Sequence, residues 1–190
     1  MVIDRLCDWA KGQNATVACF YLDFADQKEQ SPTNILSSLL KQVVGGLKKI
    51  PIDIVQAFRD QEKAIGSRKL GLSEIVGMLQ DTSSSQRTFL CIDALDECMA
   101  EYRATLLDSL RQILHKSPST RIFLAGRLHI RDEVEKHLSG RVAAVSITPT
   151  RDDIIRFLQA KFKEDITPDA MDKSLEEDII KTILETVSEM

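Results

Sequence analysis

Three acidic residues that follow an apolar run have the clearest chemical potential in this sequence. Asp93 comes directly after four apolar residues, Phe89–Ile92, and Asp96 and Glu97 follow within one turn. In open α/β sheets, ligands bind at the carboxyl ends of the strands, where such a run would place Asp93. Mg²⁺ takes one or two protein carboxylates and completes its octahedron with water and phosphate oxygens. Asp93 is therefore a candidate Mg²⁺ ligand, and Asp96 and Glu97 are candidates for orienting or deprotonating a water that attacks a phosphate.

The same acids also have an ordinary structural interpretation. Asp96 could cap a helix that begins near Glu97, and the charge of Glu97 would favour the N-terminus of that helix. Asp93 could be a turn residue at the end of a strand. Asp23, at the end of an earlier apolar run, could face the same edge, although a capping or turn role is favoured there. The residues alone leave both interpretations open.

The elements that would position these acids alternate between strands and helices. The predicted strands are Thr16–Phe24, Arg87–Asp93, Arg121–Ala125 and Val142–Ile147. The predicted helices are Val2–Ala10, Pro32–Val44, Ile52–Ile65, Leu72–Leu79, Met99–His115, Arg131–Leu138, Asp152–Phe162 and Ser174–Met190. We also expect a serine-rich loop over Asp81–Gln86 and a core position for Trp9. This alternation predicts an α/β fold with a mainly parallel sheet and helices on both faces.

Composition excludes several classes of protein. The 190 residues include 25 basic and 29 acidic side chains, a net charge of −4, which argues against a nucleic-acid-binding chain. No apolar run approaches the ~18 residues that a membrane span needs. None of the four cysteines has C-x-x-C spacing, so we expect buried or free thiols and a cytoplasmic location.

Four segments of the chain resemble the NACHT-type NTPase domain of fungal signalling proteins, in the version called the nephrocystin-like N-terminal domain. Val17–Phe24 is similar to the aromatic-rich strand of that family, and Ile35–Val44 is similar to its leucine-rich helix. Phe89–Cys98 is similar to its Walker B segment, hhhhDxLDE, and Ile122–Ile130 to its sensor strand. The resemblance extends over the whole chain in order and spacing.

The resemblance implies a fold and a role for each candidate residue. The fold is P-loop NTPase-like, with strand order 5-1-4-3-2 when the strands are numbered along a complete domain. Asp93 would hold Mg²⁺, mostly through water, and the extra acids Asp96 and Glu97 would position the attacking water. Arg127 would be the first sensor and would reach the γ-phosphate with its fixed fork of donors. The residues alone favour a simpler interpretation, in which Arg127 is a surface arginine that follows a strand.

One motif of the family is missing from this sequence. The phosphate loop, G-x-x-x-x-G-K-[ST], supplies backbone N–H groups, a lysine and a Mg²⁺ ligand, and no such sequence occurs in the 190 residues. We expect strand 1 and this loop to precede Met1 in a longer protein, with residues 1–165 forming the remaining NTPase core and 166–190 the start of a helical region. Mg²⁺ and ATP or GTP would bind the complete domain, and this chain alone would hold neither tightly.

The expected function is that of a fragment of a NACHT-type nucleotide-dependent signalling switch, which is an NTPase when complete and inactive as this chain. Nucleotide state would then control the change between a closed monomer and an oligomer, with an effector domain upstream and recognition repeats downstream. Its partners would be the nucleotide and copies of itself or related NACHT chains. One alternative is a non-enzymatic interaction module that pairs with a full-length relative through its open sheet. Another is an unrelated α/β fold with an acidic metal-binding edge.

Overall fold

The computed structural model describes residues 2–63, 70–140, 142–164 and 172–188. It divides into two compact parts, Met1–Val142 and Ala143–Met190, which are described separately.

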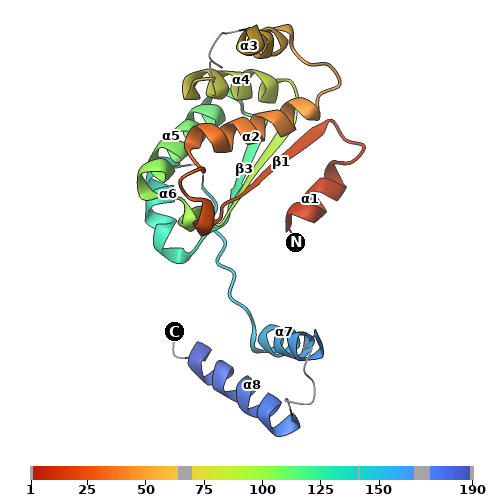
Figure 1. Cartoon of the computed structure of the whole chain (residues 1–190), viewed down its shortest axis with the longest axis vertical. Helices are drawn as coiled ribbons and strands as arrows, with labels where there is room; N and C mark the ends of the chain where they lie inside the picture. The colour runs from red at the N-terminus through yellow and green to blue at the C-terminus, as the bar shows by residue number, and fades with distance from the viewer. Residues whose placement is uncertain (1, 64–69, 141, 165–171, 189–190) are drawn as a thin grey trace. The chain divides into compact units, whose positions relative to one another are not determined.

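A three-stranded parallel sheet organises the first part (Figure 1). Its strands are β1 (Ala15–Tyr21), β2 (Arg87–Asp93) and β3 (Thr120–Leu124), in the order β1-β2-β3. The central strand β2 is buried over five consecutive residues, as expected for a parallel strand that is covered on both faces. The predicted α/β class with a mainly parallel sheet is confirmed.

Three helices pack on one face of this sheet. They are α2 (Pro32–Gly45), α4 (Leu72–Ser84) and α5 (Ala100–Lys116). Their apolar stripes form the main core with Leu90 and Ile92 of β2. Two more helices belong to this part, α3 (Ile52–Lys63) and α6 (Arg131–His137). Ser31 caps α2 by accepting a hydrogen bond from Asn34 N–H, and Pro32 occupies the first helical position, where a missing N–H costs nothing.

Helix α1 (Val2–Ala10) covers the opposite face. Trp9 meets the ring of Phe89 edge-on at a centroid distance of 5.6 Å. Because Phe89 and Leu90 are consecutive in a strand, they point to opposite faces, so the sheet has helices on both sides, as predicted. Trp9 was predicted to be a core residue and is instead 40% exposed, because the sheet face covers only one side of its ring.

Two local predictions were wrong. Val142–Ile147 is not a strand: residues 142–150 make no sheet pairing, and Val145 and Ile147 are more than 80% exposed. A strand exists only by pairing with a neighbour, and the implied order placed this segment beside strand 1. The described residues contain no such strand, so only the 4-3-2 portion of that order is present, as β3-β2-β1.

The second wrong prediction is the loop over Asp81–Gln86, because α4 continues to Ser84. Thr82 Oγ1 donates to Met78 O at 2.7 Å, and Ser84 Oγ donates to Gln80 O at 2.7 Å. Hydroxyls that bond back to the preceding turn remain compatible with a helix. The serine-rich segment therefore forms the last turn of α4.

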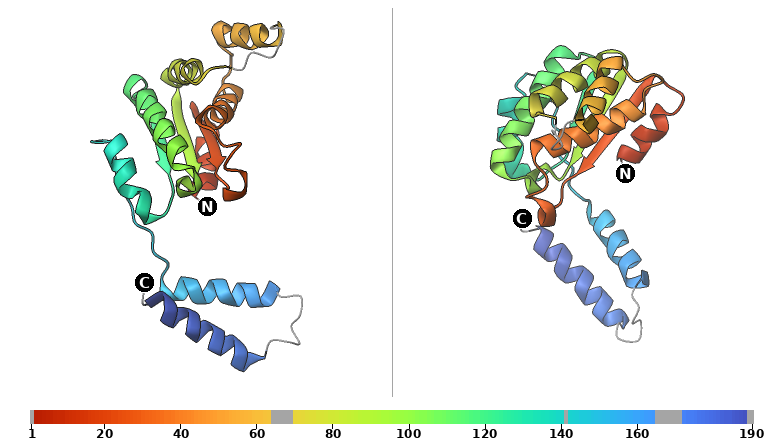
Figure 2. Two further views of the ribbon diagram at one scale, coloured as in Figure 1. Left: turned by 60° about the vertical axis from the view of Figure 1, so that its left-hand side comes forward. Right: turned by 45° about the horizontal axis from the view of Figure 1, so that its top comes forward.

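The second part contains α7 (Arg151–Glu164) and α8 (Lys173–Ser188), which lie side by side (Figure 2). Both helices were predicted. Among the described residues, none of the helices is long and apolar enough to cross a membrane. The four cysteines are free thiols, as predicted.

Candidate functional site

Asp93 is the last residue of β2 and lies at the carboxyl edge of the sheet, half-buried. Its main-chain carbonyl accepts a hydrogen bond from Leu22 N–H at 3.1 Å, which extends the ladder with β1 by one step. Its Oδ1 accepts a hydrogen bond from Ala94 N–H at 3.0 Å. Within the described part of the chain, no other hydrogen bond or ion pair engages this carboxylate, so Oδ2 is available to a ligand.

The chain turns sharply immediately after Asp93. Ala94 has φ 55° and ψ 42°, in the left-handed region that non-glycine residues seldom adopt. A short 3₁₀ turn, η2 (Leu95–Glu97), follows and buries Leu95 completely in the core. Backbone strain of this kind costs on the order of 1–3 kcal/mol and persists where the surrounding structure over-determines it. The buried Leu95 provides that constraint here, and it fixes the direction in which Asp96 and Glu97 leave the turn.

Asp96 connects this turn to the end of the neighbouring strand. Its Oδ1 accepts a hydrogen bond from Arg127 N–H at 3.1 Å, and its Oδ2 lies 3.4 Å from Arg127 Nε. The side chain of Asp96 is 8% exposed, whereas that of Arg127 is 79% exposed. The alternative interpretation of Asp96 as a helix cap is wrong, because helix α5 has its N-cap at Met99.

Two backbone contacts hold the strand end beside the turn. Ala125 N–H donates to Ile92 O at 3.0 Å, and Leu95 N–H donates to Ala125 O at 2.8 Å. A Cβ on Gly126 would lie 2.7 Å from Ile130 Cδ1 and 3.3 Å from Asp96 Oδ1. Gly126 therefore permits the close approach of the two segments. No role was predicted for Gly126 from the sequence. Its position between a strand and the candidate Arg127 could have predicted a close approach of two segments.

Glu97 is held by a different segment. Its Oε2 accepts a hydrogen bond from Phe24 N–H at 2.9 Å, and its main-chain carbonyl accepts one from Gln27 Nε2 at 2.6 Å. Phe24 belongs to a short 3₁₀ turn after β1, η1 (Phe24–Asp26). The sequence did not predict that this turn contributes to the site. Asp23 caps that turn by accepting a hydrogen bond from Ala25 N–H, so its favoured interpretation is confirmed.

The arrangement brings all four predicted residues to one edge of the sheet. Asp93 ends β2, Arg127 follows the end of the adjacent strand β3 and pairs with Asp96, and Glu97 contacts the segment after β1. The described residues contain no group of three His, Cys, Asp or Glu side chains that could hold a metal ion. Asp93, with one carboxylate oxygen available, fits a Mg²⁺ ion that is held mainly by water and phosphate, and does not fit a metal caged by protein ligands.

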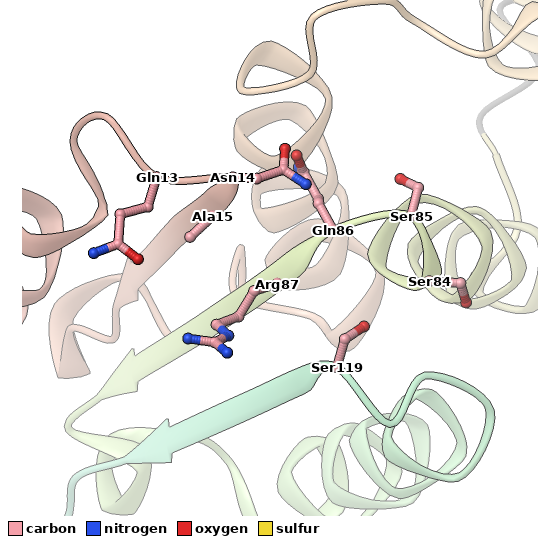
Figure 3. A pocket seen from close by; sticks show the side chains of 8 residues that line it. All are labelled: Gln13, Asn14, Ala15, Ser84, Ser85, Gln86, Arg87 and Ser119. Carbon is pink, nitrogen blue, oxygen red and sulfur yellow. The ribbon is translucent and has the colours of Figure 1, made fainter.

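A hollow lies at the opposite, amino edge of the sheet (Figure 3). Its volume is about 470 Å³, and the residues around it are Gln13, Asn14, Ala15, Ser84, Ser85, Gln86, Arg87 and Ser119. The serine hydroxyls there donate to main-chain carbonyls: Ser85 to Thr82 O, and Ser119 to Ser83 O. These side chains satisfy the carbonyls at the C-terminus of α4, which have no partner within the helix. The polar character of this hollow is thus explained by capping.

Residues 1–127 match the family described as Nephrocystin 3, N-terminal. The match covers 127 of the 190 residues and includes α1, the whole sheet, Asp93 and Arg127. The chain belongs to this family, and the resemblance to the nephrocystin-like N-terminal domain is confirmed over these residues.

Comparison with curated protein sequences gives no match. Among solved structures, the chain is similar to the Walker-type ATPase PABY2304 of Pyrococcus abyssi, with 16% sequence identity and a TM-score of 0.49. The alignment covers 95% of this chain and 61% of the ATPase chain, so this chain spans about three fifths of that protein's length.

Proposed function

We propose that the chain provides the Mg²⁺- and γ-phosphate-facing edge of a NACHT-type nucleotide-dependent switch. The observation that carries the proposal is the placement of Asp93 at the carboxyl end of β2, next to the segment that follows the adjacent strand β3, where Arg127 pairs with Asp96. Ligands of open α/β sheets bind at this edge. Membership of the nephrocystin N-terminal family supports the same assignment.

Each residue has a role that its surroundings allow. Asp93 would hold Mg²⁺, through water, with the oxygen that the turn leaves available. Arg127 would reach the γ-phosphate with its terminal nitrogens, since its side chain is largely exposed. Glu97 is engaged through Oε2, so its Oε1 is the oxygen that could orient an attacking water. When bound, Mg²⁺ would neutralise charge on the phosphate oxygens.

The site needs a phosphate-binding backbone that this sequence does not encode. No G-x-x-x-x-G-K occurs in it, so we propose that ATP or GTP binds tightly only where such a loop is supplied. In this proposal residues 1–165 form the nucleotide-binding core and 166–190 begin the next, helical region. Self-association, cytoplasmic location and a signalling output belong to the same proposal.

A second candidate function is a non-enzymatic interaction module. Within the described residues, no strand pairs with the outer edge of β3, and Phe123 on that strand is 45% exposed. An unpaired strand edge is a template for pairing with another chain. The two candidates differ in one respect that can be measured, because only the first requires the carboxylate of Asp93.

The test is Mg²⁺-dependent hydrolysis of ATP and GTP by the protein translated from its natural transcript. We expect Asp93→Ala to lower turnover by at least about 100-fold, because the metal loses the carboxylate that the proposal assigns to it. Asp81→Ala removes an exposed acid from α4 and is the matched control, with turnover unchanged. Unchanged turnover in the Asp93 variant would overturn the assignment. In the 190-residue chain without nucleotide, tight Mg²⁺ binding that Asp93→Ala abolishes would also count against it, since it would indicate a simple metal site.

A further inference from the structure

The two oxygens of Asp96 are both directed at one residue. Oδ1 accepts the main-chain N–H of Arg127 at 3.1 Å, and Oδ2 lies 3.4 Å from Nε of the same side chain. We infer that Asp96 is a positioning residue for Arg127, which it holds so that the terminal guanidinium nitrogens face the carboxyl edge of the sheet. This inference rests on the proposed function, and it replaces the water-activating role that the sequence predicted for Asp96.

Burial and bonding argue against direct action of Asp96 on water. A residue that activates or orients water needs an oxygen that water can reach, and the Asp96 side chain is only 8% exposed with both oxygens engaged. A buried carboxylate must be paired, and Arg127 supplies that pairing. Glu97 differs because its side-chain hydrogen bond involves Oε2 alone. The two neighbouring acids therefore have different tasks.

The geometry of the arginine suits a pre-oriented phosphate ligand. Its guanidinium carries five N–H donors in a rigid fork, and the contact with Asp96 involves Nε, the inner nitrogen. The two terminal nitrogens remain for a ligand, on a side chain that is 79% exposed. A long exposed side chain loses much rotamer freedom on binding, and prior orientation reduces that cost.

Asp96 is itself fixed relative to β3. Leu95 N–H donates to Ala125 O at 2.8 Å, and the glycine at 126 brings the strand end to within contact of Asp96. The carboxylate therefore cannot follow Arg127 if the arginine moves. A rigid anchor of this kind is what positioning of a catalytic or binding group requires.

The experiment compares Asp96→Asn with a matched control, Glu135→Gln. The control breaks an exposed Arg131–carboxylate pair of 2.7 Å on α6, outside the site. The first measurement is the affinity of the naturally translated protein for a non-hydrolysable nucleoside triphosphate and for the corresponding diphosphate. We expect Asp96→Asn to lower the triphosphate preference about three- to tenfold, with diphosphate affinity unchanged, and Glu135→Gln to leave both affinities unchanged.

The second measurement is made on the 190-residue chain without nucleotide. The Arg127 Nε–H resonance should exchange with water more slowly in the wild type than in Asp96→Asn, at equal thermal stability. Equal exchange rates in the two proteins overturn the inference. So does an Asp96→Asn variant that loses hydrolysis but keeps the full triphosphate preference, because Asp96 would then act on water. If Arg127→Ala keeps that preference, the proposed sensor role fails instead, and the exchange measurement still decides whether Asp96 orients the arginine.

Discussion

The two edges of the sheet are both polar, but their polar groups are used differently. At the amino edge, the hydroxyls of Ser85 and Ser119 are donors to the last carbonyls of α4. At the carboxyl edge, Asp93 keeps one carboxylate oxygen available, and Arg127 keeps most of its guanidinium exposed. A count of polar residues would favour the hollow at the amino edge. The difference teaches that a candidate site is identified by donors and acceptors that the protein's own hydrogen bonds leave available, and not by the number of polar residues.

Replacing an arginine at each edge is the strongest way to break this comparison. We expect Arg127→Ala to reduce the preference for triphosphate over diphosphate about 10- to 100-fold, since a charge-assisted hydrogen bond contributes about 1.5–3 kcal/mol. Arg87→Ala removes an exposed arginine from the amino edge, where its guanidinium lies 5.8 Å from the ring centre of Trp9. This control should leave both affinities unchanged. Equal losses in the two variants would show that the edges do not differ in the proposed way, and the measurement is equilibrium titration with each nucleotide.

Gly126 tests whether the carboxyl edge depends on close packing. We expect Gly126→Ala to lower the free energy of unfolding by about 1–3 kcal/mol, because its Cβ would approach Cδ1 of the buried Ile130 side chain to 2.7 Å. Gly77→Ala is the matched control, since nothing lies within 4 Å of its new Cβ and alanine favours the interior of helix α4 by roughly 0.5–1 kcal/mol. Urea unfolding of both variants measures the difference. A Gly126→Ala variant as stable as the wild type would mean that the two segments have room to separate.

The sequence predicted the three paired strands and most of the helices because these follow from periodicity, and a short motif predicted that Asp93 ends a strand. The apolar run Phe89–Ile92 ends at Asp93, so the sequence directly predicted both that the strand is buried and where it ends. The link between Asp96 and Arg127 could not be predicted, because it depends on the left-handed turn at Ala94 and joins residues that are 31 positions apart in the sequence. The predicted strand at Val142–Ile147 failed for the converse reason. Its apolar, β-branched composition is real, but pairing is a property of a partner strand and not of the segment itself.

Ser117 tests the structural interpretation of the amino edge. Its hydroxyl is fully buried and donates to Gln80 O at 2.7 Å. We expect Ser117→Ala to lower the free energy of unfolding by about 1–2 kcal/mol, because the Gln80 carbonyl loses the buried one of its two side-chain donors and keeps only Ser84 Oγ. Ser85→Ala changes an exposed hydroxyl at the same edge and should stay within about 0.5 kcal/mol of the wild type. Urea unfolding measures both. A change in nucleotide affinity in either variant would contradict the separation of the two edges.

Cys91 lies in the middle of β2, between the two edges of the sheet. Its replacement is expected to have the smallest of these effects, a change in how stability depends on pH. Burial, followed by the neighbouring thiol of Cys19, raises the pKa of Cys91 to about 12. Its value in the unfolded chain is about 8.5, so the folded state favours the neutral thiol, and the stability that this provides is lost as the pH rises from about 8.5 towards 12. We expect the free energy of unfolding to fall by roughly 1 kcal/mol between pH 8 and pH 9.5 on account of this group. Cys91→Ala should show a shallower decline over the same interval.

The comparison uses slopes because the smaller side chain also leaves a cavity, which shifts the stability equally at both pH values. Equal slopes would show that Cys91 can ionise within the folded sheet, and the strand between the two edges would then be less rigid than the burial of its thiol indicates.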